Sequence, residues 1–403
     1  MKLFAFGSNG SGQLGIGSTE DVSIPTECLF DTPPDSADND EIVHISAGGN
    51  HTLLLTKRGY VYAAGCNYDG RCGTLESESK TPEENILRFR RVVLYDSTTA
   101  SQVYSFKFVS ATWEGSILVA SVRYISIDSA AEVIGDRVYV LGSTPKGELG
   151  LGEKVHTAVP GTFIPNFPPT GSKITALASG MWHAVAVLST ENVCGWGASR
   201  KGQLGESLKA QKIAWKPSPV EGVPFRTTGA LCGREFTVFL GRRDRGELKV
   251  FGDSNNRWGV LDVPSSLRLN DSSAVSHIDV GASWSGVYVC VAPVETSNSS
   301  SAVPPAGTLV AWGRNDRGQL PPSDLPPLTH LAVGSEHVVA LLQDGSVAVF
   351  GWGEHGNCGL DTDPHGNVAG SYNLIPLSGD IIAAGEKVVR VGAGCATSWL
   401  IMS

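Results

Sequence analysis

The chain has 403 residues, including 48 glycines and 22 prolines, and its formal net charge is −9. This acidic balance argues against direct nucleic-acid binding, because surfaces that bind phosphate backbones are usually basic. The sequence contains no run of eighteen apolar residues that could span a membrane. Its eight cysteines are expected to be thiols of a cytoplasmic protein, with the nucleus as a second location.

Seven short apolar runs, each followed by a glycine-rich loop, divide the chain. The first run, residues 2–6, leads into a loop with Gly7, Gly12 and Gly15. The later loops start near residues 65, 142, 197, 252, 313 and 351. Glycines at such fixed offsets indicate positive φ angles or a close backbone approach that no Cβ would allow. The copy at 252–260 lacks the second and third glycines and looks one residue short.

A second repeated string alternates with the first. It consists of two apolar runs around a turn, which is typical of a β-hairpin. The clear copies turn on Gly48, Gly180 and Gly334, and the weaker ones on Ala111, Gly233, Gly281 and Gly392. Repeats of roughly fifty residues with several strands each indicate a propeller, a solenoid or an array.

The two ends of the chain decide among these architectures. The last hairpin, 388–401, lacks the strand that follows it in every other unit, whereas strand 2–6 has no hairpin before it. A solenoid ends in capping repeats, but a closed ring needs none. We therefore predict an all-β fold, a seven-bladed β-propeller spanning 1–403 as one domain. Its N-terminal strand, 2–6, completes the last blade.

Several segments depart from the repeat. Insertions are expected at 75–104, 121–137 and 295–306. Within the first, Leu87–Leu94 could be an outer strand with a basic face, and a nucleic-acid patch is the less favoured interpretation. The acidic segment 31–41 is expected to be solvated. Pro321–Pro327 should replace an outer strand by a stiff extended link.

The hairpin geometry places all turns and glycine loops on one rim of the ring. Three residues after each turn stand His51, Glu114, His183, Phe236, Trp284, His337 and Cys395. The histidines suggest a metal site, but recurrence at one repeat position favours bonds to the backbone of the neighbouring blade. Sevenfold spacing also keeps them too far apart for zinc–nitrogen bonds of about 2 Å. Cys72 and Cys358 replace leucines of other copies and are expected to fill the core.

The rim is the candidate functional surface. No nucleophile elbow, P-loop or dinucleotide fingerprint is present, so neither catalysis nor a cofactor is expected. Tryptophans mixed with carboxylates on a rigid face are typical of a protein-binding hot spot. The candidate residues are Trp113, Glu114, Trp182, Trp284, Glu336, Trp352, Glu354 and His355. Each tryptophan could instead be a wedge between blades, and Trp399, inside a strand, is expected in the core.

The paired strings resemble the regulator-of-chromosome-condensation repeat over essentially the whole chain. Residues 352–359 (Trp-Gly-Glu-His-Gly-Asn-Cys-Gly) and 394–399 (Gly-Cys-Ala-Thr-Ser-Trp) resemble one subfamily of small single propellers. Its members pair with the zinc-ribbon electron carrier of diphthamide synthesis and Elongator-dependent tRNA modification. The resemblance implies a non-enzymatic subunit of a heterodimer with that carrier. It would support wobble-uridine modification and diphthamide formation on elongation factor 2, with any contact to Elongator indirect.

Other functions remain open for this fold. The namesake of the family is a nucleotide-exchange factor for the Ran GTPase on chromatin, and exchange activity is the main alternative. The acidic charge and the lack of a basic N-terminal extension speak against it. An adaptor in membrane traffic or ubiquitin transfer would need a further domain.

Overall fold

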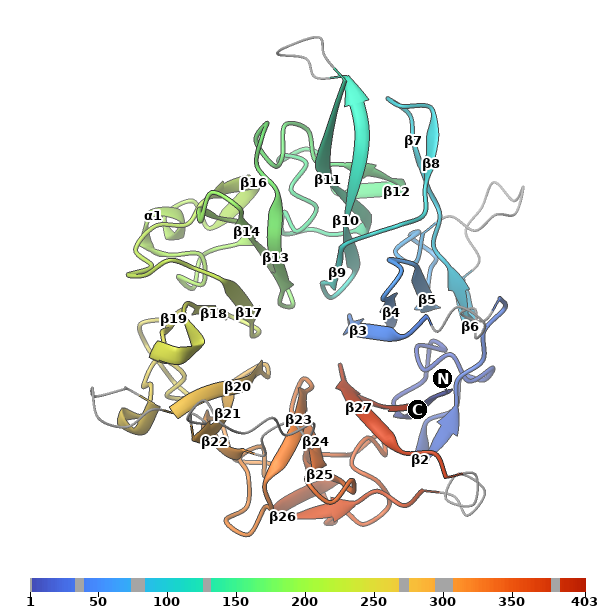
Figure 1. The fold of residues 1–403 in the computed structure, drawn as a ribbon, viewed down its shortest axis with the longest axis vertical. Helices are drawn as coiled ribbons and strands as arrows, with labels where there is room; N and C mark the ends of the chain where they lie inside the picture. The colour runs from blue at the N-terminus through green and yellow to red at the C-terminus, as the bar shows by residue number, and fades with distance from the viewer. Residues whose placement is uncertain are drawn as a thin grey trace, which may run out of the picture.

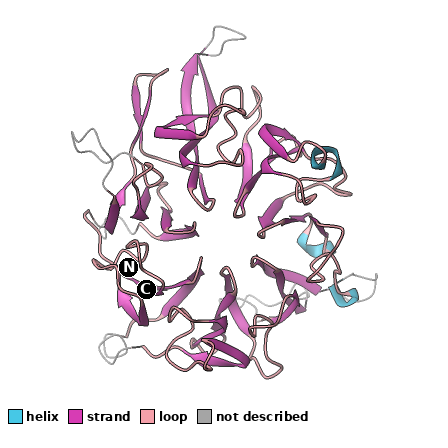
Figure 2. Cartoon of the chain, turned by 180° about the vertical axis from the view of Figure 1, so that it is seen from behind, coloured by secondary structure: helices cyan, strands magenta, loops and turns pink. Residues whose placement is uncertain are grey.

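Antiparallel sheets arranged around a central axis form the whole molecule (Figure 1). The computed structural model describes residues 2–32, 40–73, 84–125, 132–267, 275–293, 307–377 and 385–403. Seven of its sheets are blades of a ring, which confirms the predicted seven-bladed propeller. The helical segments of the described residues are short and lie beside the sheets (Figure 2). They are α1 (Glu206–Lys209), η2 (Arg243–Arg245) and η3 (Ser265–Leu267).

Four blades contain four strands from one continuous stretch of chain, ordered from the axis outward. Blade one is β3 (Ile42–Ala47), β4 (His51–Thr56), β5 (Val61–Cys66) and β6 (Asn85–Arg91). Blade two is β9 (Phe108–Ala111), β10 (Gly115–Ile125), β11 (Glu132–Ser143) and β12 (Thr157–Phe163). Blade three is β13 (Ile174–Ser179), β14 (His183–Leu188), β15 (Val193–Ala198) and β16 (Ile213–Pro219). Blade six is β23 (Leu328–Val333), β24 (His337–Leu342), β25 (Val347–Trp352) and β26 (Asn367–Leu374).

Two blades have three strands each in the described part of the chain. Blade four is β17 (Gly229–Cys232), β18 (Phe236–Leu240) and β19 (Leu248–Gly252). Blade five is β20 (Val275–Ala282), β21 (Gly286–Pro293) and β22 (Thr308–Gly313). Residues 314–327 contain no strand, as expected for the proline-rich link.

Blade seven joins the two ends of the chain. Its strands are β27 (Val388–Ala393), β28 (Thr397–Met402), β1 (Lys2–Gly7) and β2 (Val22–Glu27). β1 pairs with β28 from Lys2 opposite Met402 to Gly7 opposite Thr397. In Figure 1 the N and C labels accordingly lie side by side. The predicted closure is confirmed, and the N-terminus supplies two strands to this blade where one was predicted.

The core consists of apolar layers between neighbouring blades. Side chains alternate between the two faces of a strand. In β14, Ala184 and Ala186 pack toward blade two, whereas Val185 and Val187 pack toward blade four. Trp399 is fully buried, as predicted. Cys72 and Cys358 are also buried in these layers, which confirms that they fill the core.

The segment predicted as the first insertion is partly regular structure. β6 is the outer strand of blade one, so a strand close to 87–94 is confirmed. Arg88 and Arg90 on it both pair with Asp31, which offsets one of their two positive charges. The short hairpin of β7 (Leu94–Asp96) and β8 (Ser101–Val103) follows and docks on blade two.

The other predicted interruptions have different outcomes. The insertion at 121–137 is an extension of β10 and β11, which stay paired as far as Ile125 opposite Glu132. The predicted insertion at 295–306 lies outside the described residues. The acidic segment 31–41 is described only at its ends, and there the expectation of full solvation is wrong for Asp40. Its side chain is buried, and its Oδ1 accepts a bond from the Arg58 N–H.

Candidate functional site

The turns between first and second strands and the glycine loops lie on one rim of the ring. The residue before each second strand fixes the glycine loop of its own blade through the backbone. The Cys66 N–H donates to the Asn50 carbonyl, and the Trp352 N–H donates to the Glu336 carbonyl. Because all eight candidate residues belong to these turns and loops, the structure brings them to the same rim.

The register of three turns differs from the prediction. The N–H of the turn residue donates to the carbonyl of the residue three positions later, as the Gly48 N–H does to the His51 carbonyl. By this criterion the turns lie at Thr112, Ser283 and Gly394, where Ala111, Gly281 and Gly392 were predicted. The position three after the turn is therefore occupied by His51, Gly115, His183, Phe236, Gly286, His337 and Thr397. The assignments of Glu114, Trp284 and Cys395 to that position were wrong.

The three histidines tie neighbouring blades together. Nε2 of His51 lies 2.9 Å from the Ser116 hydroxyl, which itself donates to the carbonyl of Arg71. His183 and His337 make the same contact with hydroxyls of the next blade. Burial lowers the pKa of His51 to about 3, assisted by the Arg71 charge, and lowers the pKa of His183 and His337 to about 4. These neutral imidazoles bond hydroxyls, where we had expected backbone groups.

Backbone hydrogen bonds between neighbouring blades surround most of the axis at the rim. They join residues one position after the turns, except in blade seven, where the turn residue Gly394 accepts the bond. The Gly49 N–H donates to the Trp113 carbonyl, and the Trp113 N–H donates to the Met181 carbonyl. On the other side, the Trp284 N–H donates to the Ser335 carbonyl. These bonds fix Trp113 and Trp284 at the innermost edge of the rim.

The side chains of three candidate tryptophans meet over the axis. The Trp113 ring centroid lies 5.8 Å from that of Trp284 and 6.4 Å from that of Trp182. All three side chains are half-buried, and so is that of Trp352. By contrast, Trp196 and Trp399 are wholly buried between blades. The four candidate tryptophans are thus more exposed than the two interblade tryptophans, as residues of a rim surface would be.

A second cluster occupies the rim of blades five, six and seven. Buried Glu336 accepts bonds from Arg314 and, at 2.9 Å, from Nη1 of Arg317. The Arg317 guanidinium lies 5.2 Å from the Trp352 ring, whose Nε1 donates to Glu354 at 3.1 Å.

His355 extends this cluster to the first glycine loop of the chain. Its ring stands edge-on to Trp352 at 5.4 Å, and its Nδ1 lies 2.8 Å from Asp21. The remaining candidate, Glu114, is half-buried beside Trp113. The structure therefore groups the candidate residues into an aromatic centre and a charged flank.

The sequence analysis missed the cations that cover these rings. The Lys146 ammonium lies 3.7 Å from the Trp182 ring, and Arg234 lies 5.7 Å from the Trp284 ring. Trp258, also missed, stands between Arg257 and Arg314 at 4.7 and 4.9 Å.

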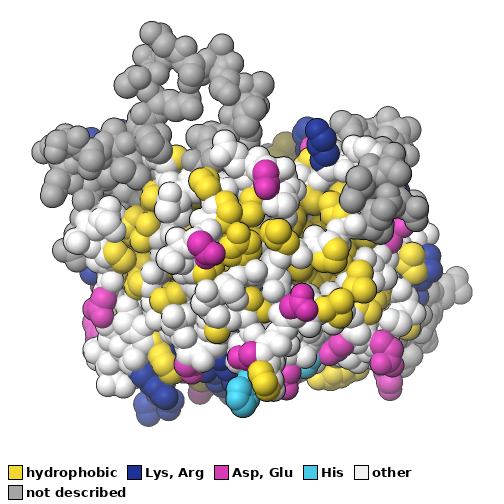
Figure 3. Space-filling view, turned by 90° about the horizontal axis from the view of Figure 1, so that it is seen from below, with side chains coloured by type: hydrophobic (Ala, Val, Ile, Leu, Met, Phe, Trp, Pro, Cys, Tyr) yellow, Lys and Arg dark blue, Asp and Glu magenta, His cyan; other side chains and the backbone are white. Residues whose placement is uncertain are grey.

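The signal for these cations was present in the sequence, because most of them lie in the glycine loops that had already been placed on the rim. In the side view, charged side chains gather along the lower edge of the ring, below a wall of hydrophobic and uncharged side chains (Figure 3).

The loop at 252 was predicted to be one residue short but is longer than the others. The Gly259 N–H donates to the Asn256 carbonyl, as Gly12 does to Asn9, so Gly259 takes the place of Gly12. It stands seven residues after Gly252, compared with five in the first loop. The extra length carries Arg257 and Trp258 onto the rim.

No helix in the described ranges is both long and apolar enough to cross a membrane. Within the same ranges, no three histidine, cysteine or acidic side chains are grouped as metal ligands would be.

Comparisons with known proteins agree with this architecture. The family model described as "RCC1-like domain" matches residues 2–400. An RCC1 repeat-containing protein of Schizosaccharomyces pombe is 29% identical, covering 99% of this chain and 98% of the relative. The secretion-regulating guanine nucleotide exchange factor of Mus musculus is 27% identical, covering 90% of this chain and 76% of its own.

Two solved structures share the fold. Prp20p of Saccharomyces cerevisiae superposes with a TM-score of 0.70 at 19% identity, covering all of this chain and 91% of that one. Human WBSCR16 superposes with a TM-score of 0.68 at 16% identity, covering all of both chains.

Proposed function

We propose that this chain, which belongs to the family of RCC1-like domains, is a non-enzymatic scaffold. It forms a heterodimer with a small zinc-ribbon electron carrier. Through that carrier it supports Elongator-dependent modification of tRNA wobble uridines and diphthamide synthesis on elongation factor 2. Contact with the Elongator complex itself is indirect, and the protein needs no cofactor of its own.

The aromatic centre of the rim is the observation that carries a protein-binding role. Trp113, Trp182 and Trp284 leave apolar ring surface exposed on a rigid backbone frame. Partly exposed tryptophans surrounded by arginines and carboxylates are typical of residues that dominate binding energy at interfaces. A docking partner would bury these rings without rearranging the blades.

The choice of partner is supported by the placement of the two distinctive segments. Residues 352–359 and 394–399 come from blades six and seven, yet they touch. The Ser398 hydroxyl donates to the Asn357 carbonyl at 2.9 Å, and the Asn357 side chain donates to the Trp352 carbonyl at 2.8 Å. The segments that carry the subfamily resemblance thus form one patch, and this patch includes Trp352, Glu354 and His355 of the charged flank.

In this scaffold the rings provide affinity and the charges provide specificity. Burial of the tryptophans stabilises the complex, while the flank around Glu336 and Glu354 orients the carrier and speeds its approach. A rigid face of this kind holds a small metal protein in one orientation and limits access to its redox site.

The test is titration calorimetry of the zinc-loaded carrier with the intact chain. Trp113→Ala is expected to weaken binding about thirtyfold, which corresponds to ~2 kcal/mol for a hot-spot tryptophan. Tyr95→Ala is the matched control, because Tyr95 is an exposed aromatic residue on β7, away from the rim. If the unaltered chain fails to bind the carrier at micromolar concentration, the heterodimer proposal is wrong.

A guanine-nucleotide exchange factor for a Ran-type GTPase is the second candidate. It is favoured by two similar proteins, the secretion-regulating guanine nucleotide exchange factor and Prp20p, which is described as binding Gsp1p and histones. Release of a fluorescent guanine nucleotide from the GTPase distinguishes the candidates. Acceleration by this chain would establish exchange activity, and an unchanged rate with micromolar chain would remove it.

A further inference from the structure

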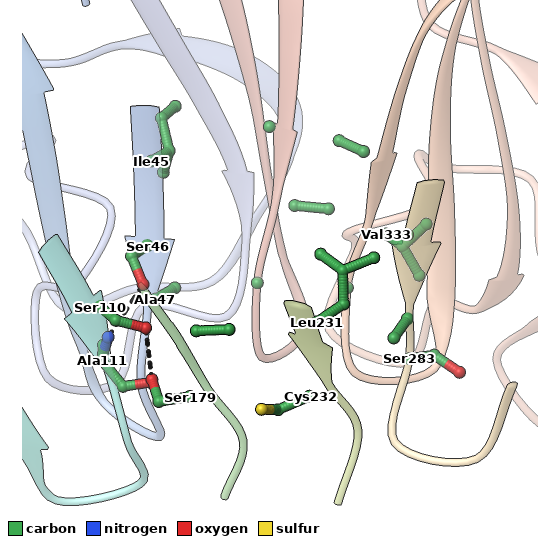
Figure 4. Close-up of a pocket in the computed structure, with 18 of the residues that line it drawn as sticks. Ile45, Ser46, Ala47, Ser110, Ala111, Ser179, Leu231, Cys232, Ser283 and Val333 are labelled. Atoms are coloured by element: carbon green, nitrogen blue, oxygen red, sulfur yellow. Dashed lines mark hydrogen bonds between the residues drawn. The ribbon is translucent and has the colours of Figure 1, made fainter. Parts of the chain in front are cut away.

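A channel runs along the axis of the ring. The first strands of all seven blades line it, and it encloses about 420 Å³. Its middle is lined by small side chains, several of which are shown in Figure 4. Among them are Ser46, Ala47, Ala111, Ala332 and Cys232. A volume of this size is within the range of small-molecule sites in proteins.

The rim end of this channel is narrowed by aromatic side chains. Trp113 and Trp284 both line it, and their rings meet 5.8 Å apart, from blades two and five on opposite sides of the axis. The channel is therefore most accessible from the end away from the rim.

At that far end four titratable side chains share one position in the repeat. His44, Asp279, His330 and Arg390 each stand four residues before the turn of their blade, and all four line the channel. They come from four consecutive blades: one, five, six and seven. Blades two, three and four carry Phe108, Ala176 and Gly229 at the same position.

This uneven distribution argues against an architectural role. A residue required by the blade itself would recur around the ring, as the interblade histidines recur. Instead, the polar residues occupy one side of the channel end, and the opposite side is apolar or small. Polar groups that converge on one side of a concave, otherwise apolar space are typical of a binding site.

Arg390 is held at the wall with hydrogen-bonding capacity to spare. One Nη1–H donates to the Val43 carbonyl at 3.0 Å. No carboxylate in the described ranges lies within 4 Å of its guanidinium, and a guanidinium has five N–H donors. Nδ1 of His330 is shielded from solvent and has no hydrogen-bond partner among the described residues.

The charges of Arg390 and Asp279 influence the pKa values of the two histidines. Burial lowers the pKa of His44, and the Arg390 charge lowers it further. The pKa of His330 is also lowered, by burial first and in part by Arg390, against the opposing effect of Asp279. Both imidazoles are therefore neutral donors and acceptors at pH 7. Asp279 is fixed by two backbone N–H groups, those of Val280 and Leu331.

We propose that this channel binds a small organic anion. The anionic head group lies against Arg390, between His44 and His330, and the apolar body extends between the small side chains toward the two tryptophans. Asp279 accepts a hydrogen bond from the ligand and disfavours a second negative charge. This site lies at the end of the channel away from the partner-binding rim, and it does not depend on the function proposed above.

The experiment is titration calorimetry of the intact chain with benzoate, phenyl phosphate and inorganic phosphate. We expect benzoate or phenyl phosphate to bind with submillimolar affinity and inorganic phosphate to bind at least tenfold more weakly, because it lacks the apolar body. The first two probes distinguish a carboxylate ligand from a phosphate ligand. Failure of all three to bind at millimolar concentration would overturn the proposal.

Two variants locate the site. Arg390→Gln is expected to weaken binding of the better probe at least tenfold. Ala332→Leu, which narrows the channel without touching Arg390, is expected to do the same. Arg88→Gln is the matched control, because Arg88 is exposed on the outer strand β6 and pairs with Asp31. If both variants bind the probe like the unaltered chain, or if the control loses as much affinity, the channel is not the site.

Discussion

Glu148 allows the energetics of the rim to be tested directly. Its side chain is buried at a position where other loops carry Gln13, Gln203 and Gln319. Glu148 accepts the N–H of Lys146 at 2.8 Å, and Gln203 accepts the N–H of Lys201 in the same way at 2.9 Å. A glutamine amide makes this contact without a charge, so Glu148→Gln is expected to stabilise the protein.

The size of this stabilisation follows from the pKa of Glu148 in the folded protein. Burial raises the pKa of Glu148 from 4.5 to about 7. At ~1.4 kcal/mol per pH unit, this difference corresponds to about 3 kcal/mol. The folded state holds its proton more tightly than the unfolded state, so stability decreases as pH rises from 4.5 to 7. The full destabilisation is present above pH 7 and disappears below pH 4.5.

The assay is thermal unfolding of both proteins at pH 8 and pH 5. With an unfolding entropy of about 2 cal/mol/K per residue, 3 kcal/mol in this chain raises Tm by about 4 °C. We expect this increase at pH 8 and a much smaller one at pH 5. Gln203→Glu is the reverse control and should lower Tm at pH 8. An unchanged or lower Tm of Glu148→Gln at pH 8 would refute the reasoning.

Three further substitutions test other buried groups. Arg71→Gln leaves Asp69 buried without its ion-pair partner. We expect it to lower the free energy of unfolding, measured in urea, by about 3 kcal/mol or more, and a decrease of less than 1 kcal/mol would contradict this. Burial alone favours protonated Asp96, but hydrogen bonds from Tyr139, Thr98 and Arg137 outweigh it and hold its pKa well below the ordinary value. Asp96→Asn should therefore speed hydrogen exchange in β7 and β8 at pH 7, and unchanged exchange would show that the hairpin is held otherwise. His51 stays neutral in the folded state, whereas in the unfolded state it is protonated below pH 6.5. This difference lowers the stability of the folded state at acidic pH, by about 2 kcal/mol at pH 5. His51→Gln should lose stability less steeply than the unaltered chain between pH 7 and pH 5, and equal slopes would be contrary to this assignment.

The closed ring was predictable because its signals are local and repeated. Positive φ is required at Gly7, Gly12 and Gly15, so glycine recurs there in most copies. Strand 2–6 supplies the strand that is missing after the last hairpin, and this match predicted that the ring is closed. The outer strands were less predictable, because they lie at the end of loops of variable length and only one face of them is buried.

The turn register was mispredicted for a steric reason. Gly48 has no positive φ, but a Cβ there would come within 2.3 Å of the His51 ring. A large side chain three residues later is thus one reason for glycine at the turn. Blade two has Gly115 at that later position and Thr112 at the turn, and blade five has Gly286 and Ser283 in the same places. Without a turn glycine to mark them, the turns of these two blades were placed one and two residues too early.

A similar argument distinguishes side chains at the axis that hold the blades together from side chains that can bind a partner. The backbone ring is made equally by Gly49 and by Trp113, so its bonds do not require a side chain at that position. The backbone bonds therefore do not depend on the side chains of Trp113 and Trp284, and their rings can serve the rim surface. They also stand between the rim and the channel. Trp113→Ala should consequently weaken partner binding while leaving Tm nearly unchanged, whereas a large fall in Tm would make the tryptophan part of the architecture after all.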